Sequence, residues 1–404
     1  MRLAIVLGAA LGGAIAGLAV LAGALERPRA LEPLAPDAHG PIERAIPEGA
    51  TVAHDEAELG ALLADPEGPR EIWLEGRVYR GNFTITGRPV ALRGVGGTVL
   101  EGRGEGTVVT LEAEGASLEN VTVRHSGRSH VQEDAGVKAR ARGVRIARVA
   151  VEDALFGIEL SPCPGCTLER SSVVGAEGDS ELKGDGIKLW EAHGTVVRGC
   201  LVDRARDMVV WYSRGVVLED NTVRRSRYGA HFMYSHDGSV LRNRFENDIV
   251  GVFVMYSSRL SIADNHMLGA SGAAGVGIGF KESDGATLRG NVVAGNTTGV
   301  YLDRSPRSAA EPLEFTGNLF GANQVGVRFH GADVGLRFVR NDFRQNVALV
   351  EVEGGGSAQS VDFRQNHFSD YAGYDLDGDG VGDVPFQQKR LARDLTVAHP
   401  PVRL

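Results

Sequence analysis

The sequence predicts an all-β fold: a right-handed parallel β-helix (solenoid) of about 13 coils with a short N-terminal capping helix. Three observations support this prediction. A glycine recurs at intervals of 22–29 residues with one interval of 43, an asparagine series runs in phase with it, and short alternating strands lie between them. Such repeats are too short for a helix and its turns, and alternation with β-branched residues indicates strands.

The N-terminus is typical of an export signal. Residues 1–24 carry Arg2, then an unbroken apolar stretch and small residues before Glu26, so we expect a signal peptide cleaved after Ala24. The alternative is an uncleaved anchor, because about 20 apolar residues can span a bilayer. Residues 25–50 contain five prolines and are expected to form an extended leader.

An N-terminal cap is expected over residues 51–70, because an open solenoid end has to be covered. Within it, Asp55 precedes Leu59, Leu62 and Leu63, a pattern that suits a short amphipathic helix. The parallel β-helix itself is assigned to residues 71–370.

Two in-phase residue series are interpreted as structural. Residues one period apart lie over one another about 4.8 Å away, so asparagines in register can bond as a ladder, and glycines are expected to take backbone angles that other residues resist. The 43-residue interval is interpreted as two coils, with Asp207–Trp211 supplying the one without a glycine. The glycines are Gly157, Gly186, Gly229, Gly251, Gly277, Gly299 and Gly326, and the asparagines are Asn221, Asn243, Asn265, Asn291, Asn318, Asn341 and Asn366.

An apolar row is predicted on the outside of consecutive coils. If the residue after each repeat glycine points inward, alternation points every second residue outward. An exposed patch of Trp, Tyr and Met is typical of an interface, although a covering loop or a register shifted by one residue would bury it. The expected partner-binding residues are Trp190, Trp211, Tyr212, Met233, Tyr234, Met255 and Tyr256, and the three tyrosines are expected to stack.

Two metal sites are predicted from residue chemistry. His231, Met233 and Met255 fall on adjacent coils, and imidazole with thioether ligands suits Cu(I). The second site lies in an Asp-rich tail, residues 371–404, where alternating carboxylates and a glycine at the sixth position suit Ca²⁺. Phe386 stands at the twelfth position in place of a bidentate Glu, so the tail is not a full EF-hand loop. Its expected ligands are Asp375, Asp377, Asp379, Val381 and Asp383.

Three cysteines cannot form a disulfide framework. For Cys163 and Cys166, a local loop-closing disulfide and a soft-metal site both remain open, with Cys200 buried in the first case. A thioredoxin-like role is disfavoured because no βαβ pattern surrounds the pair.

The charge balance excludes one class of partner. A net charge of −9 and the absence of a long basic run argue against nucleic-acid binding. A polysaccharide-acting β-helix enzyme, a uronan lyase or epimerase, is the alternative function, by fold analogy alone. For that chemistry Asp303, His330 and Glu282 are only scattered single candidates.

The coils at residues 184–190, 227–236, 250–257 and 298–303, with the tail at 368–383, resemble the NosD family of nitrous oxide reductase maturation proteins. The resemblance covers about residues 45–390. It implies a periplasmic, non-catalytic β-helix that works with the membrane subunits of an ABC transporter and a copper-chaperone lipoprotein. Together they would help to assemble the copper-sulfide centre of nitrous oxide reductase. The Cys163–Cys166 turn is not part of that pattern.

Overall fold

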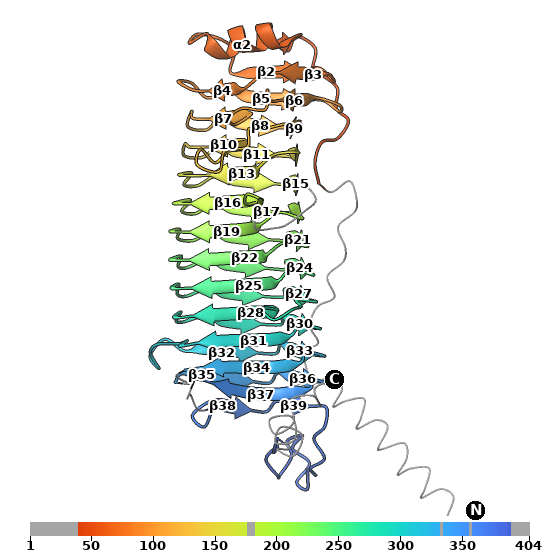
Figure 1. Cartoon of the computed structure of the whole chain (residues 1–404), viewed down its shortest axis with the longest axis vertical. Helices are drawn as coiled ribbons and strands as arrows, with labels where there is room; N and C mark the ends of the chain where they lie inside the picture. The colour runs from red at the N-terminus through yellow and green to blue at the C-terminus, as the bar shows by residue number, and fades with distance from the viewer. Residues whose placement is uncertain (1–38, 176–181, 332–333, 355–357, 389–404) are drawn as a thin grey trace, which may run out of the picture.

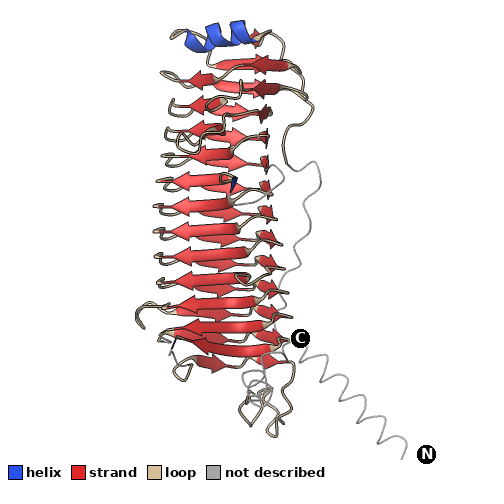
Figure 2. Ribbon diagram, in the orientation of Figure 1, coloured by secondary structure: helices blue, strands red, loops and turns tan. Residues whose placement is uncertain are grey.

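The molecule is a rod of stacked coils, each built from up to three short parallel strands (Figure 1). The computed structural model describes residues 39–175, 182–331, 334–354 and 358–388. Strands dominate these residues, and Figure 2 shows a helix lying across one end of the rod. The predicted parallel β-helix of about 13 coils is thereby confirmed.

Sheet A is defined as the sheet that begins each coil. Within the described residues it has 14 strands, each hydrogen-bonded to the equivalent strand of the next coil. Its strands are β1 (Val52–Ala53), β2 (Glu71–Leu74), β5 (Ala91–Gly94), β8 (Ser117–Glu119), β11 (Arg145–Ala147), β14 (Thr167–Glu169), β17 (Val196–Arg198), β20 (Val217–Glu219), β23 (Ser239–Leu241), β26 (Ser261–Ala263), β29 (Thr287–Arg289), β32 (Leu313–Thr316), β35 (Leu336–Val339) and β38 (Asp362–Arg364).

Sheet B follows sheet A in each coil and has 13 strands in the part of the chain that the structure describes. Its strands are β3 (Val78–Arg80), β6 (Val99–Glu101), β9 (Thr122–Arg124), β12 (Ala150–Glu152), β15 (Ser172–Val174), β18 (Leu201–Asp203), β21 (Thr222–Arg224), β24 (Arg244–Glu246), β27 (His266–Leu268), β30 (Val292–Ala294), β33 (Leu319–Gly321), β36 (Asp342–Arg344) and β39 (His367–Phe368).

Sheet C closes each coil and contains the longest strands of the rod. It has 12 strands over the same described residues. They are β4 (Phe83–Ile85), β7 (Val109–Leu111), β10 (Ala135–Ala139), β13 (Phe156–Leu160), β16 (Ile187–Trp190), β19 (Asp207–Trp211), β22 (Tyr228–Met233), β25 (Val250–Met255), β28 (Val276–Lys281), β31 (Thr298–Asp303), β34 (Val325–His330) and β37 (Ala348–Glu353). The coil predicted at Asp207–Trp211 is therefore present as β19.

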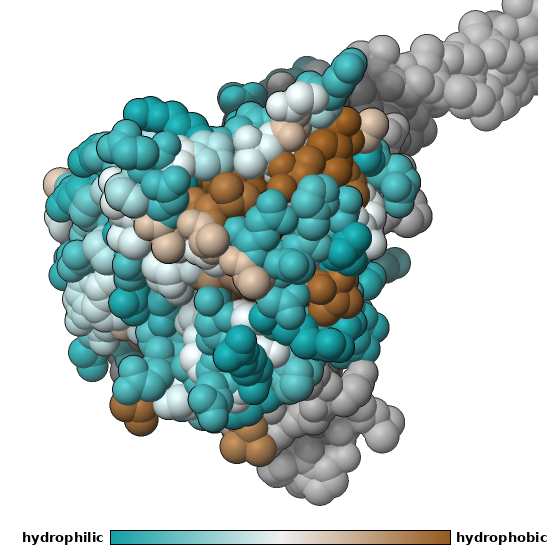
Figure 3. All heavy atoms as spheres, turned by 90° about the horizontal axis from the view of Figure 1, so that it is seen from above, coloured by the Kyte–Doolittle hydropathy of each residue, from teal (hydrophilic) through white to brown (hydrophobic). Residues whose placement is uncertain are grey.

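The capping helix α2 (Glu56–Ala64) covers the N-terminal end of the rod. Asp55 is its N-cap, with a side chain that accepts a hydrogen bond from the backbone N–H of Glu58, and Leu59 and Leu63 face the core. The helix begins after the predicted cap does, because Val52–Ala53 first pairs with β2. Seen down the rod from this end, the surface is mostly hydrophilic with a few apolar areas (Figure 3).

The repeat glycines serve a different purpose from the predicted one. None of the seven has a positive φ, so backbone angle does not explain them. A Cβ atom at Gly277 would lie 2.5 Å from Cγ1 of Val293 and 2.8 Å from Nδ2 of Asn296. The glycine is needed because Val293 of sheet B packs against the backbone of sheet C at this point.

Three ladders of polar side chains hold the corners of the rod. The predicted one runs from Asn221 to Asn366, each side-chain oxygen accepting from the preceding asparagine. The sequence interpretation missed a second asparagine ladder, Asn296 to Asn346, at the corner between sheets B and C. It also missed a serine ladder between sheets C and A, formed by Ser213, Ser235, Ser257, Ser283 and Ser305.

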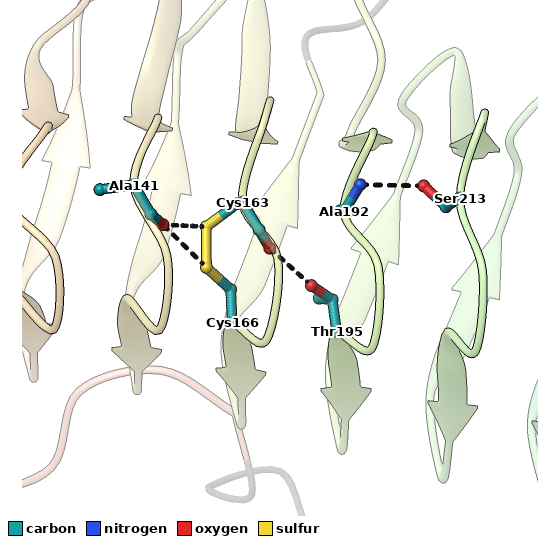
Figure 4. The surroundings of a disulfide bond; sticks show 6 residues. All are labelled: Ala141, Cys163, Cys166, Ala192, Thr195 and Ser213. Carbon is teal, nitrogen blue, oxygen red and sulfur yellow. Dashed lines mark hydrogen bonds between the residues drawn. A yellow bond between two sulfur atoms is a disulfide. The ribbon is translucent and has the colours of Figure 1, made fainter.

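Cys163 and Cys166 form a disulfide, the first of the two alternatives. The two sulfur atoms lie 3.1 and 3.3 Å from the carbonyl oxygen of Ala141 in the preceding coil (Figure 4). In the next coil Ala192 occupies the corner position that serine takes from Ser213 onward, and its N–H donates to Ser213. The disulfide therefore closes a turn just beyond the end of the serine ladder.

The end of the predicted leader packs along the side of the rod. His39 contacts the carbonyl oxygen of Gly199 through Nδ1 at 2.8 Å, and the Gly40 N–H donates to the Arg170 carbonyl. Two further bonds join the backbone of Ile42 to the side chain of Asn120. The proposed signal peptide, residues 1–24, lies outside the described residues. In the described part of the chain, every helix is too short or too polar to cross a membrane.

Candidate functional site

The apolar row lies on the outward face of four consecutive sheet C strands, β16, β19, β22 and β25. Trp190 pairs in register with Trp211, and Met233 with Met255, while Trp211 is also paired with Met233. The residue before each of them points inward and is fully buried, as Phe232 and Val254 illustrate. The sulfur and indole groups therefore point away from the core, in the register expected from alternation.

The aromatic rings form a continuous series of contacts along this face, edge-on or tilted at Trp190 and stacked between the tyrosines. The Trp190 ring lies 5.8 Å from Trp211 and 4.7 Å from Tyr212, centroid to centroid. Tyr212 stacks on Tyr234 at 5.2 Å, and Tyr234 on Tyr256 at 5.0 Å. The expected tyrosine stack is therefore present.

The three tyrosines occupy a turn position at which the backbone is left-handed. Their φ angles are 51°, 51° and 50° for Tyr212, Tyr234 and Tyr256, values that a non-glycine residue adopts only at a cost. The serine that follows each tyrosine fixes this turn through the serine ladder. Tyr212 and Tyr234 are 41% and 43% exposed, so the ladder holds a rigid aromatic edge out to solvent.

His231 lies beneath this edge in an apolar setting. Its ring stacks on Tyr228 at 4.7 Å and meets the edge of Trp211 at 5.8 Å. Burial lowers the pKa of His231 to about 4, against a smaller opposing effect of the Asp207 carboxylate. The imidazole is therefore neutral at neutral pH, the protonation state that a metal ion requires.

The imidazole of His231 is placed beside a thioether. Its Nε2 lies 3.3 Å from Sδ of Met255, and Nδ1 is buried with no hydrogen-bond partner among the described residues. Bonds of about 2.0–2.1 Å to nitrogen and about 2.3 Å to sulfur would place two tetrahedral ligands about 3.6 Å apart. The observed pair is within a few tenths of that separation, and Met233 is the register partner of Met255. These residues fit a soft monovalent copper ion.

The face is more sheltered than the sequence indicated. His231 is 8% exposed, Val209 is fully buried, and the Met and Trp side chains are half-buried by one another. At the N-terminal end of the face, Lys188 is covered by the loop before β10 through an ion pair with Glu133 at 2.5 Å. The open part of the face therefore begins at Trp190.

The sequence analysis did not identify Tyr228 as part of this site. Its ring stacks on the imidazole of His231 and helps to bury it.

A charged cluster occupies the C-terminal continuation of the same face. Asp303 and His330 are register partners on β31 and β34, and Nδ1 of His330 lies 3.8 Å from Oδ1 of Asp303. The description of these residues as scattered was therefore wrong. The coil that separates them is 27 residues long, not the 22 of the Met coils, which hides their register. Glu282 does stand apart, at the corner, where it faces Arg304 at 3.8 Å.

The acidic tail brings three of its five predicted ligands together. Asp375, Asp377 and Asp379 each offer a carboxylate oxygen, all within 4.8 Å of one another and exposed. Backbone N–H groups of Gly378 and Gly380 donate to Asp375, which lowers the pKa of that carboxyl. Asp383 instead accepts from the N–H of Leu376, and Val381 donates its N–H to Asp379. The calcium assignment stays a prediction.

One groove lies elsewhere, beside the packed leader. It has a volume of about 700 Å³ and is lined mainly by charged groups, including Arg145, Glu169 and Arg198. Glu169 lies 3.3 Å from Arg145 and 3.6 Å from Arg198. Because these charges already pair across the coils, the groove adds no chemistry to the sheet C face.

Comparison with known proteins decides the family. Residues 168–373 match the family model described as "Periplasmic copper-binding protein (NosD)". The chain belongs to the NosD family. It is 30% identical over 403 residues to a protein of Pseudomonas aeruginosa named "Probable ABC transporter binding protein NosD", covering 90% of this chain and 87% of the relative. A protein of Stutzerimonas stutzeri with the same name is 26% identical over 386 residues, covering 86% and 82%.

Two solved structures with the same architecture are carbohydrate-active enzymes. The A-module of mannuronan C-5 epimerase AlgE6 from Azotobacter vinelandii has a TM-score of 0.53 at 14% identity, covering 80% of this chain and 97% of its own. A GH87 α-1,3-glucanase catalytic unit from Streptomyces thermodiastaticus has 0.59 at 13%, covering 82% and 70%. At these identities the likeness shows the fold alone. The NosD relatives are named as binding proteins, not as enzymes.

Proposed function

We propose that this chain is a periplasmic accessory protein for assembly of the copper-sulfide centre of nitrous oxide reductase. In this role it accepts Cu(I) on the sheet C face and docks its partners there. The partners are the membrane subunits of an ABC transporter, a copper-chaperone lipoprotein and the reductase. The family model and the names of the relatives support copper binding and a transporter partner.

The observation that carries the copper part is the contact between His231 and Met255. A neutral imidazole 3.3 Å from a thioether sulfur, with a second thioether in register, is a soft donor set. Copper is cargo in this role and is passed on, which a half-buried site suits better than a closed cage. The stacked tyrosines beside it give a partner a rigid surface with a polar hydroxyl edge.

A Cu(I) titration of the purified chain under reducing conditions, against a competing chelator, tests the copper part. We expect one Cu(I) to bind, and Met233→Ala/Met255→Ala to weaken binding at least tenfold, because both sulfur ligands are removed. Met267→Ala is the matched control, since that thioether points into the core. Absence of binding, or equal affinity of the double variant and the wild type, would contradict the proposal.

Docking is tested separately by a charge placed on the tyrosine edge. Tyr234→Glu introduces a carboxylate at an exposed position without touching the core. We expect it to abolish co-purification with the transporter membrane subunits and to leave the reductase without its copper-sulfide centre. Ser261→Glu, exposed on the outward face of sheet A, is the control and should leave both unchanged. If the Tyr234→Glu chain still supported complete assembly of the copper-sulfide centre, the tyrosine edge would not be a docking surface.

The charged cluster gives little support to the alternative function, an enzyme that acts on a uronic-acid polysaccharide. Three carboxylates, Asp303, Glu351 and Glu353, outnumber the two cations Lys281 and Arg328 there. A surplus of negative charge repels a uronate chain, so the cluster suits a positively charged ligand better.

A further inference from the structure

The charged cluster of sheet C contains a row of metal-type donors that the copper site does not use. Asp303, His330 and Glu353 occupy the same outward position on β31, β34 and β37, and each pairs in register with the next. An imidazole therefore stands between two carboxylates on three consecutive parallel strands. Adjacent strands lie about 4.8 Å apart, so one strand spacing separates His330 from each carboxylate, and the exposed side chain of Glu353 would have to turn toward His330 to share an ion with it.

The distances at the centre of the row are close to those of a binding site. Nδ1 of His330 lies 3.8 Å from Oδ1 of Asp303 and 3.2 Å from the hydroxyl of Tyr301. Two ligands bound at about 2.0–2.1 Å in tetrahedral geometry are separated by about 3.4 Å. A movement of a few tenths of an ångström would therefore let His330 and Asp303 share one ion. The Asp303 side chain is only 14% exposed, which limits competition from water.

The local charge favours a cation. The three carboxylates Asp303, Glu351 and Glu353 are opposed by Lys281, 3.7 Å from Asp303, and by Arg328, 3.0 Å from Glu351 and 3.5 Å from Glu353. The three carboxylates exceed the two cations by one negative charge, which a divalent ion would more than neutralise. An anionic ligand would meet net repulsion.

The donor types separate this site from the sulfur site. Imidazole with carboxylate ligands selects Zn²⁺ or Cu²⁺, whereas thioether ligands select Cu(I). We propose that His330 and Asp303, with Glu353 as third ligand, bind a divalent transition-metal ion of the Zn²⁺ and Cu²⁺ class. The Tyr301 hydroxyl, which contacts Nδ1 of His330, would then donate to a bound carboxylate.

Lys281 sets the affinity of this site. Its ammonium group competes with the metal ion for Asp303, so the wild-type chain should bind with modest affinity. Removal of that charge should make Asp303 a better ligand. Lys281→Met removes the charge and leaves an apolar side chain one heavy atom shorter, whose thioether is a poor ligand for Zn²⁺, so we expect this variant to gain rather than lose Zn²⁺ binding.

Calorimetric titration of the full chain with Zn²⁺, and electron paramagnetic resonance of the chain with Cu²⁺, test the proposal. We expect His330→Ala and Asp303→Asn each to weaken Zn²⁺ binding at least tenfold and to remove the nitrogen-ligand signal of bound Cu²⁺. Lys281→Met should tighten Zn²⁺ binding several-fold. His367→Ala is the matched control, because His367 also contacts one carboxylate, Asp342, at 2.7 Å but on sheet B.

Equal Zn²⁺ affinity of His330→Ala and the wild type, or equal losses in His330→Ala and His367→Ala, would overturn the proposal. Unchanged or weaker binding by Lys281→Met would exclude Asp303 as a ligand. Circular dichroism of each variant separates loss of binding from loss of fold. Cu(I) affinity should be unchanged in His330→Ala, so failure of this site is distinguishable from failure of the copper site at His231.

Discussion

Asn265→Ala is expected to lower the free energy of unfolding by about 3–5 kcal/mol. Asn265 is fully buried in the middle of the first asparagine ladder. Its side-chain oxygen accepts from the backbone N–H of Asn243 at 2.8 Å, and its amide donates to the carbonyl of Val240 at 2.8 Å. Asn265→Ala leaves the N–H of Asn243 and the carbonyl of Val240 buried without these hydrogen bonds, which costs about 1–3 kcal/mol for each group, and it also creates a cavity.

Urea unfolding followed by circular dichroism measures this loss. Gln324→Ala is the control, because that amide is exposed beside the second ladder and its removal should change stability by less than about 0.5 kcal/mol. Coils contact mainly their neighbours, so Asn265→Ala is also expected to separate the unfolding of the two halves of the rod. A loss below about 1 kcal/mol would show that the ladder does not hold the corner.

Asp248→Asn is expected to stabilise the protein at pH 8. Asp248 stands where the second ladder would place an asparagine, and its Oδ1 accepts from the N–H of Ser226 at 2.8 Å. Its Oδ2 is buried and has no hydrogen-bond partner in the part of the chain that the structure describes, and burial raises the pKa of this carboxyl well above its usual value. The amide introduced by Asp248→Asn can donate to the Val223 carbonyl, as Asn296 donates to Met267.

The pH dependence follows from the direction of the pKa shift. Because the folded-state pKa of Asp248 is raised, the carboxyl contributes stability below its unfolded pKa of about 4 and loses that contribution as pH rises through the folded pKa. We therefore expect Asp248→Asn to gain about 1–3 kcal/mol over the wild type at pH 8 and less at pH 4. The free energy of unfolding of both chains between pH 4 and pH 8 measures this difference.

Asp370→Asn is the control for Asp248→Asn. Its side chain is exposed at the end of the rod, so the change should alter stability by less than about 0.5 kcal/mol. A loss of stability in Asp248→Asn at pH 8 would mean that the buried carboxyl is held by a partner that an amide cannot replace.

The sequence was sufficient to predict the coils of the β-helix and the outward direction of the apolar row. Residues such as Met233 and Met255 repeat at a constant spacing of 22 residues. Once one residue of the repeat is correctly assigned to the core, alternation therefore gives the direction of the equivalent side chains in the other coils. The burial of the outward-facing side chains could not be predicted in this way, because it depends on which loops pack against them. Lys188, for example, is buried, and its ammonium group pairs with Glu133 of a loop that sequence spacing cannot place.

The charged cluster was missed because coil length varies. Asp303 and His330 are 27 residues apart, across an inserted turn before β32, so they do not share the 22-residue spacing of the Met coils. Only the strand register brings them together. The serine ladder, by contrast, could have been found, since Ser213, Ser235 and Ser257 follow the tyrosines at the same 22-residue spacing.

X-ray absorption of the Cu(I)-loaded chain tests the central claim most directly, because it counts the atoms bound to copper. With His231, Met233 and Met255 as ligands, the spectrum should show two sulfur neighbours at about 2.3 Å and one nitrogen neighbour at about 2.0 Å. Met233→Ala/Met255→Ala should lose both sulfur neighbours. A wild-type spectrum with only nitrogen or oxygen neighbours would contradict a copper site on the sheet C face.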